Sequence, residues 1–400
     1  MYNIEKLDNK GRGIAYINGK ITFVPNTLPG EKVNIKIVKE AKKYNEGEVI
    51  EFITKSDKRR EGICPYFGLC GGCELMHMTY EDTISYKKEK LESILYKYVH
   101  IEKDIDIIKS EKVLNYRNKI TLKVENNKYG YYKNNTHSLV EIDNCLLAED
   151  AINRFIKDIK RLNIKIGEVT IRSNYNEELL IYIKSKDKLE IDYDYLISKH
   201  KIVGVVLNGN TVFGESSFVE CINNMYFQVS YDSFFQVNRN ICSKLFDLIL
   251  EEIGENETIL DLYCGVGTLG INAKKRAGKV FGIEIIKNAI LNAVTNAKIN
   301  KRDNIYYMFG DVSKNITKVT DRIDTIIVDP PRAGLDSVTK KTILNFKAKK
   351  IIYVSCDPMT LARDLNDLQS AYSIIDIKGL DMFPMTQHCE SITVLEKNNE

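Results

Sequence analysis

The chain contains 400 residues, of which 44% are hydrophobic, and carries a formal net charge of +3. This length exceeds that of a typical single domain, so two or three domains are expected. No apolar run is long enough to cross a membrane, and the first residues are polar and charged, which excludes a membrane protein and argues against a secretion signal. A cytoplasmic protein is expected, with its nine cysteines serving as ligands, nucleophiles or core residues rather than as disulfides.

Residues 1–55 are expected to form a small β-barrel. An Asn18-Gly19 pair between two apolar runs is a strong signal for a hairpin turn. Residues 1–60 hold 13 Lys and Arg against 8 Asp and Glu, which suits a binder of polyanions, although a solvated lysine-rich surface explains the charge equally well. The expected strands follow one another at short spacing: Gly13–Ile17, Ile21–Val24, Glu31–Val38 and Gly47–Ile53.

Residues 56–232 are expected to form a mixed α+β domain. A helical stretch lies around Tyr86–Tyr98, and short strands such as Tyr116–Val124 and Tyr129–Tyr132 follow it.

Three cysteines, Cys64, Cys70 and Cys73, lie within ten residues at the start of this middle region. Four thiolates normally complete a zinc or iron–sulfur site, and Cys145, the next cysteine along the chain, is the best fourth ligand. The spacing by itself fits either kind of site. The absence of two paired Cys-x-x-Cys motifs favours an iron–sulfur cluster over zinc.

Residues 233–400 alternate between strands and helices, a pattern that predicts an α/β domain with a parallel, doubly wound sheet. The expected strands are Glu257–Tyr263, Lys279–Glu284, Ile305–Phe309, Ile323–Asp329, Lys350–Cys356, Ser373–Leu380 and Ser391–Leu395.

A glycine-rich turn follows the first of these strands. Gly265, Gly267 and Gly270 form a G-x-G-x-x-G pattern between a strand and a helix, which is typical of a loop that an adenosyl ligand approaches closely. Glu284 ends the next strand, where it can accept hydrogen bonds from ribose hydroxyls. Asp261 fits the cationic methionyl part of S-adenosylmethionine better than the pyrophosphate of NAD, which it would repel.

Several reactive or polar groups follow other strands. Cys356 comes directly after an apolar strand, where open α/β sheets bind ligands. Asp329 opens an Asp-Pro-Pro-Arg segment whose prolines make a stiff loop. Glu390 is a candidate base in the loop before the last strand, and Gln236, beside two phenylalanines, could read the edge of a nucleobase. His388 is a weaker candidate base in the same loop as Glu390.

Taken together, these motifs closely resemble the S-adenosylmethionine-dependent RNA uracil-C5 methyltransferase family over essentially the whole chain. The resemblance implies a class I (Rossmann-like) methyltransferase domain over residues 233–400 and an RNA-binding TRAM (OB-like) barrel over residues 1–55. It also implies that the four clustered cysteines bind a [4Fe–4S] cluster. The combination of barrel and cluster resembles the branch that modifies 23S ribosomal RNA, with a tRNA T-loop uridine as the alternative target and a monomer as the expected state.

The resemblance assigns a role to each residue of the catalytic region. Cys356 would attack C6 of the uracil and so make C5 nucleophilic, and Glu390 would remove the C5 proton. Gln236 and Asp329 would hold the uracil and the methyl donor. Gly265, Gly267 and Asp261 would shape the cofactor site, in which Tyr263 lines the adenosyl pocket and Glu284 holds the ribose.

Two other classes of protein share some of these features. An NAD(P)-dependent oxidoreductase with an iron–sulfur relay would explain the glycines and the cysteine cluster, but not Cys356 or Glu390. A non-catalytic RNA-binding factor would use the barrel and a structural zinc, and would not need Cys356.

Overall fold

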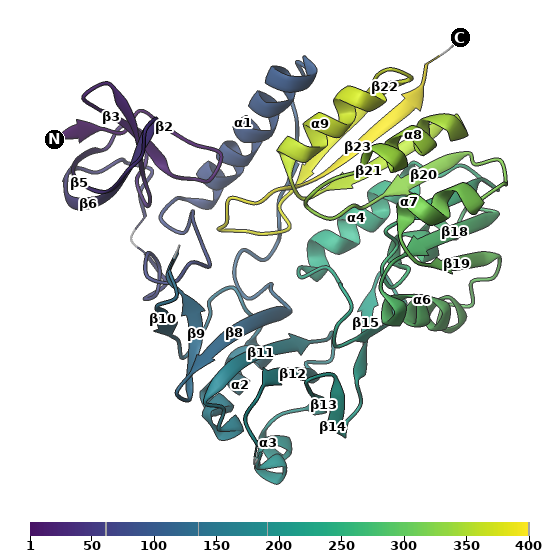
Figure 1. The fold of residues 1–400 in the computed structure, drawn as a ribbon, viewed down its shortest axis with the longest axis horizontal. Helices are drawn as coiled ribbons and strands as arrows, with labels where there is room; N and C mark the ends of the chain where they lie inside the picture. Colours follow the sequence, from purple (N-terminus) through teal and green to yellow (C-terminus); the bar gives the residue numbers. More distant parts are fainter. Residues whose placement is uncertain (61, 135, 190, 399–400) are drawn as a thin grey trace.

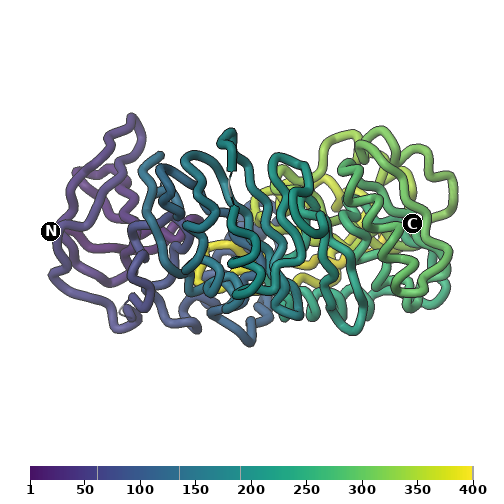
Figure 2. The backbone as a smooth tube through the Cα atoms, turned by 90° about the horizontal axis from the view of Figure 1, so that it is seen from below, coloured from purple at the N-terminus to yellow at the C-terminus, as the bar shows by residue number. Residues whose placement is uncertain are grey.

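The computed structural model describes residues 1–60, 62–134, 136–189 and 191–398. The N-terminal strands, the central sheet and the C-terminal sheet follow one another along the molecule, and the loop that joins the last two strands reaches back toward the middle (Figures 1 and 2). No helix in the described residues is long and apolar enough to span a membrane.

The predicted N-terminal barrel is a six-stranded sheet in the order β1-β5-β6-β4-β3-β2. Asn18 and Gly19 take positive φ angles of 51° and 75° at the hairpin turn between β3 and β4, as the sequence predicts. A small core of Ile4, Ala15, Val24 and Val33 holds the sheet together. Its strands are β1 (Tyr2–Asn3), β2 (Lys6–Leu7), β3 (Gly13–Ile17), β4 (Lys20–Val24), β5 (Lys32–Glu40) and β6 (Tyr44–Thr54).

The central sheet has seven strands in the order β10-β9-β8-β11-β12-β13-β14. Its residues alternate between two faces, so that Ile120, Leu122 and Val124 of β8 pack into a core with α2 (Asp150–Asp158). Helices η1 (Ile159–Leu162) and α3 (Tyr193–Lys199) lie on the same side. The strands are β8 (Lys119–Glu125), β9 (Lys128–Tyr132), β10 (Leu139–Glu141), β11 (Ile166–Ser173), β12 (Leu179–Ser185), β13 (Ile202–Leu207) and β14 (Asn210–Gly214).

The C-terminal sheet has eight strands in the order β19-β18-β17-β20-β21-β23-β22-β7. The strands from β19 to β21 are parallel as predicted, whereas β23 runs antiparallel to both of its neighbours. The strands are β7 (Ile107–Ile108), β17 (Thr258–Leu262), β18 (Lys279–Glu284), β19 (Ile305–Phe309), β20 (Thr325–Val328), β21 (Lys350–Ser355), β22 (Tyr372–Leu380) and β23 (Glu390–Lys397).

Helices cover both faces of this sheet, as its two apolar cores require. One core includes α4 (Arg239–Glu251), α5 (Thr268–Ala273) and α6 (Lys287–Ile299). The other includes α1 (Tyr80–Val99), α7 (Val312–Asn315), η2 (Ile316–Lys318), α8 (Ser337–Phe346) and α9 (Pro358–Leu368).

Some elements of the predicted middle region belong in space to the C-terminal sheet. Helix α1 packs against α9, strand β7 joins the sheet edge, and the hairpin of β15 (Ser217–Ile222) and β16 (Met225–Ser230) packs against α6. The boundaries at residues 55/56 and 232/233 stay predictions.

Candidate active site

A cavity of about 1080 Å³ lies between the central sheet and the ends of the parallel strands of the C-terminal sheet. Open α/β sheets bind ligands where the strand order reverses, here between β17 and β20. Most of the predicted site residues line this one cavity: Gln236, Tyr263, Gly265, Glu284, Asp329, Cys356, Glu390 and the cysteines Cys64, Cys70, Cys73 and Cys145.

The glycine-rich loop between β17 and α5 is shaped to receive a ligand. Tyr263 and Gly265 have φ angles of 62° and 56°, and a Cβ added to Gly265 would project into open space with nothing within 4 Å. The Glu284 carboxylate accepts hydrogen bonds from the backbone N–H of Gly265 at 3.0 Å and of Ile286 at 2.8 Å. These bonds fix the loop while leaving the backbone of Gly265 open to an adenosyl group, so the site fits S-adenosylmethionine.

Asp261 and Gly267 support this loop from behind the cavity. Asp261 is fully buried, and its Oδ2 accepts a hydrogen bond from the Gly270 N–H at 2.9 Å. Its Oδ1 has no hydrogen-bond partner among the described residues, and burial raises its pKa to about 8. At Gly267 (φ 83°), an added Cβ would approach the Tyr307 hydroxyl to 2.5 Å, so glycine is needed there for packing. Direct contact of either residue with the cofactor stays a prediction.

Cys356, Asp329 and Glu390 meet at the ends of three neighbouring strands. Asp329 follows β20, Cys356 follows β21 and Glu390 begins β23, and these strands are adjacent in the sheet. Burial raises the pKa of Asp329 to about 7, and burial together with Asp329 raises the pKa of Glu390 well above its usual value. Two carboxyl groups that oppose each other's ionisation are suited to holding and releasing a proton.

The surroundings of the Cys356 thiol favour its protonated form. Burial and the nearby Glu390 carboxyl raise its pKa to about 11, while the Arg332 guanidinium acts in the opposite direction. Arg332 also lowers the pKa of Glu390. Arg332 ends the Asp-Pro-Pro-Arg segment, and its role was not predicted from the sequence because its effect depends on strands that come together only in the fold.

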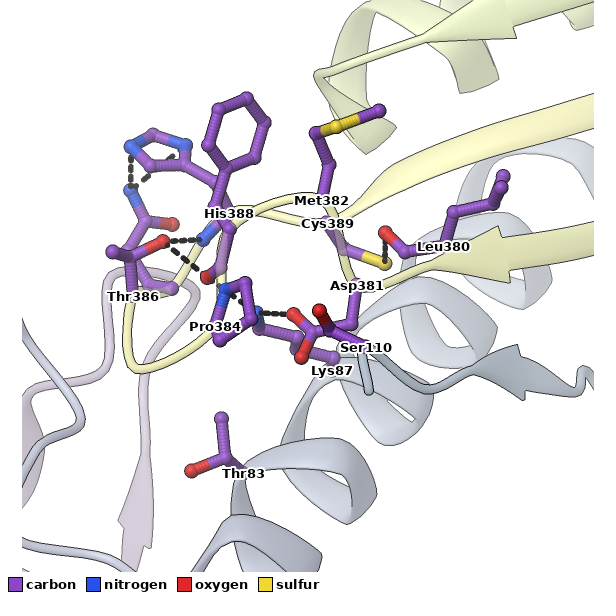
Figure 3. A network of polar contacts seen from close by, with 12 residues as sticks. Thr83, Lys87, Ser110, Leu380, Asp381, Met382, Pro384, Thr386, His388 and Cys389 are labelled. Atoms are coloured by element: carbon purple, nitrogen blue, oxygen red, sulfur yellow. Dashed lines mark hydrogen bonds and ion pairs between the residues drawn. The ribbon is translucent and has the colours of Figure 1, made fainter. Parts of the chain in front are cut away.

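The loop between β22 and β23, which leads directly into Glu390, is fastened to helix α1 (Figure 3). The side chains of Lys87 and Asp381 form an ion pair with no exposed surface. Lys87 Nζ also donates a hydrogen bond to the Phe383 carbonyl at 2.9 Å, and the Tyr80 hydroxyl donates to Asp381 at 2.8 Å. We call these contacts of Lys87 and Tyr80 with the loop the clasp. It was not predicted from the sequence, because Lys87 looks like one of many solvent-facing lysines on a polar helix.

Two residues of the same loop were uncertain from sequence. His388 lines the cavity, and burial and the surrounding cations lower its pKa to about 4, so the imidazole is neutral. Cys389 is 1% exposed, with its Sγ 3.8 Å from the Leu380 carbonyl, so it fills space beneath the loop.

The four predicted cysteine ligands surround one end of the cavity. Burial raises the pKa of Cys64, Cys70 and Cys73, and the proximity of Cys145 raises the pKa of each further. Cys145 therefore lies close to each of the other three thiols. Within the described residues, no group of three or more His, Cys, Asp or Glu side chains is placed to hold a metal ion.

Apolar side chains back the cysteine end of the cavity: Met76, Tyr116, Leu147 and Met385 pack with Cys64, Cys73 and Cys145. Thiolates are the donors that both iron–sulfur clusters and zinc take, so the chemistry of the four side chains fits either group.

The strand order, the glycine-rich loop and the acidic residue ending β18 together define a class I, S-adenosylmethionine-dependent methyltransferase. A profile of the tRNA (uracil-5-)-methyltransferase family matches residues 79–398, and a TRAM domain profile matches residues 3–50. The chain belongs to this family of RNA uracil-5-methyltransferases.

Relatives and a solved structure agree with this assignment. The chain is 34% identical to an uncharacterised RNA methyltransferase of Thermotoga maritima, in a match that covers 99% of this chain and 98% of the relative. It is 33% identical to an uncharacterised RNA methyltransferase of Halalkalibacterium halodurans, in a match that covers 99% of this chain and 96% of the relative. It is also similar to the crystal structure of Pyrococcus abyssi tRNA (uracil-54, C5)-methyltransferase in complex with S-adenosyl-L-homocysteine. That match has a TM-score of 0.83 and 26% identity and covers 99% of both chains.

Proposed function

We propose that this S-adenosylmethionine-dependent RNA uracil-C5 methyltransferase works through a covalent bond between Cys356 and C6 of the target uridine. The observation that carries the proposal is the meeting of Cys356, Asp329 and Glu390 on neighbouring strand ends, beside the open glycine-rich loop. The cofactor, when bound, supplies an electrophilic methyl group. Uracil C5 is a poor nucleophile, so the protein must first raise its electron density.

The residues of the chain perform the remaining steps. The Cys356 thiol loses its proton to water and forms a bond from Sγ to C6, and the electron pair of the C5–C6 double bond moves toward C5 and the O4 carbonyl. After C5 has gained the methyl group, Glu390 takes the C5 proton. The C5–C6 double bond forms again as the C6–S bond breaks and the thiolate leaves. Arg332, which lowers the pKa of Cys356, favours the thiolate that opens and closes this cycle.

We propose a uridine of 23S ribosomal RNA as the target, on the basis of the barrel and the cysteine cluster in one chain. The T-loop uridine of tRNA is a second candidate, because the Pyrococcus abyssi tRNA enzyme matches 99% of this chain, barrel included. The barrel by itself therefore does not separate the two targets. A base must leave its stack to reach the Cys356 thiol, so either target would be a loop nucleotide or would be flipped out.

Mapping 5-methyluridine in ribosomal RNA and tRNA from cells with and without this gene tests the target directly. Loss of a single 23S site supports the proposal, and loss of the modification in tRNA alone supports the second candidate. Loss at neither site would contradict both.

We also propose that Cys64, Cys70, Cys73 and Cys145 hold a [4Fe–4S] cluster with a structural role. The chemistry above transfers no electrons, so the cluster is not needed for redox steps. Anaerobically purified protein is expected to contain iron and sulfide in equal amounts, whereas zinc without sulfide would contradict the cluster. We also propose that the protein is a monomer and acts in the cytoplasm.

A further inference from the structure

One face of the central sheet is not covered by α2 and α3, and it meets the active-site cavity at β8. On β8 the residues of this face are Lys119, Thr121 and Lys123, which alternate with the buried Ile120 and Leu122. Lys119 and Thr121 line the same cavity as Cys356.

Lys119 has cationic neighbours and, among the residues that the structure describes, no anionic partner. Its ammonium group makes no hydrogen bond or ion pair within the described part of the chain. Burial and the nearby cations Arg172, Arg117 and Lys184 together lower its pKa to about 8. Lys123 differs, because on the same face it forms an ion pair with Glu168. On β8, Lys123 therefore has a counter-charge, whereas Lys119 has none among the described residues.

The neighbouring arginines are held in place without neutralising this charge. Arg117 donates a hydrogen bond from Nε to the Lys119 carbonyl at 3.1 Å, which keeps its guanidinium beside Lys119. Arg172, directly opposite Lys119 on β11, is 3% exposed. It donates to the backbone carbonyls of Ser230 and Ser233, and its Nε has no hydrogen-bond partner among the described residues.

The two ends of the cavity therefore differ in charge. On the side of the cofactor loop, the carboxylates of Glu284, Asp311, Asp329 and Asp336 outnumber the one cation among the described residues, Arg332, whereas Arg117 and Lys119 line the side of the central sheet. A half-buried cation without a partner is costly. A cationic methyl donor at the acidic end and an anion at the basic end would balance both.

We infer that Lys119, with Arg117 beside it, binds a backbone phosphate of the RNA next to the nucleotide that enters the cavity. The inference rests on the proposed function, because it requires RNA to reach the Cys356 thiol through this cavity. Phosphate contacts fix the register of a nucleic acid without reading its sequence. Lys119 would thus place the target uridine relative to Cys356 and would not select it.

The test measures the salt dependence of binding to a fluorescein-labelled 12-nucleotide oligouridylate. Each phosphate contact to a single strand contributes about 0.7 to the slope of log K against log salt concentration. Lys119→Met is expected to weaken binding several-fold at about 50 mM salt and to flatten the slope by about 0.7. Lys119→Arg, which keeps the charge, is expected to retain most of the slope.

Lys128→Met is the matched control, because Lys128 lies on the neighbouring strand β9 but is exposed and does not line the cavity. An unchanged slope for Lys119→Met, or an equal loss for Lys128→Met, would overturn the inference. Binding of S-adenosylhomocysteine reports on folding and is expected to be unchanged. If that binding falls while the RNA slope stays, Lys119 holds the cofactor carboxylate instead, which also overturns the inference.

The binding test does not depend on methyl transfer. A lower slope for Lys119→Met in a protein that modifies no uridine would support the phosphate site and contradict the proposed function. If Lys119→Met leaves the slope unchanged and the protein does methylate RNA, the result would contradict the phosphate site and support the proposed function.

Discussion

The Cys356 thiol is the group on which the proposed covalent mechanism depends, and it is remote from the cofactor loop in sequence. Cys356→Ala is expected to abolish methyl transfer while S-adenosylhomocysteine still binds, because Gly265 and Glu284 are unchanged. RNA carrying 5-fluorouridine at the target should form a stable adduct with the wild-type protein, since fluorine cannot leave as a proton. Turnover by purified Cys356→Ala would contradict covalent catalysis by this residue.

Glu390 is expected to act after the methyl group has moved. Its pKa is raised by burial and by Asp329, so it can accept the C5 proton and later release it. Glu390→Gln keeps the shape of the side chain but removes this capacity, and a methylated protein–RNA adduct should accumulate on a denaturing gel. Normal turnover of Glu390→Gln would assign the proton to another group, such as His388.

Arg332 is expected to set the pH dependence of the reaction. The reactive form of Cys356 is the thiolate, so the rate rises with pH while the thiol titrates. The Arg332 cation lowers the pKa of this thiol, and its removal therefore raises that pKa. Arg332→Met should shift the acidic limb of the kcat/KM profile to higher pH. Arg322→Met, at an exposed position, is the charge-matched control. If the acidic limb of the kcat/KM profile does not shift in Arg332→Met, the result would contradict the role of Arg332.

At the scale of elements, the sequence predicted what depends on periodicity and turn chemistry. The hairpin at Asn18-Gly19, the parallel strands and the helix after Cys356 were all visible, because their signals are local. The antiparallel insertion of β23 between β21 and β22 was not, although it decides that Glu390 lies beside Cys356. Strand order depends on which strand edges pair in space, and a short apolar run in the sequence does not indicate which strands will lie beside it.

The clasp from helix α1 to the β22–β23 loop is expected to position Glu390. Removing one partner of a buried ion pair leaves an uncompensated charge and costs about 3–5 kcal/mol. Lys87→Met should therefore lower both the melting temperature and kcat, with little change in KM for S-adenosylmethionine. Adding Asp381→Asn removes the stranded charge and should restore part of the melting temperature.

Lys88→Met provides the control for this element. Lys88 is the next residue of α1 but pairs on the surface with Asp104, where solvent weakens the interaction. If Lys88→Met lowers kcat as much as Lys87→Met does, the effect belongs to the helix in general and not to the clasp.

At the scale of the whole molecule, the cofactor loop, the catalytic strand ends and the cysteine cluster share one cavity. Sequence reasoning found each motif separately, because each has its own spacing. It could not show that residues from the middle region, such as Cys145 and Lys119, face the same space as Cys356. That arrangement depends on how the central sheet packs against the ends of the parallel strands, and no local pattern encodes it.

This shared cavity leads to a prediction about the cysteine cluster. Cys145 is far from Cys73 in sequence, so a cluster that joins them closes a long loop and restrains the central domain. Cys145→Ser should lower the iron and sulfide content as severely as Cys70→Ser. It should also reduce adduct formation with 5-fluorouridine RNA, because the central sheet, which we propose contacts the RNA, is no longer restrained by the cluster. Binding of S-adenosylhomocysteine should persist, since the glycine-rich loop belongs to the other wall.

Cys221→Ser is the matched control, because Cys221 lies on β15, in the hairpin that packs against α6. It is half-buried like Cys145, so the substitution tests the general effect of removing such a thiol. If Cys221→Ser loses the cluster and Cys145→Ser keeps it, the fourth ligand is wrongly assigned. If both variants keep full iron and sulfide, neither Cys145 nor Cys221 is the fourth ligand.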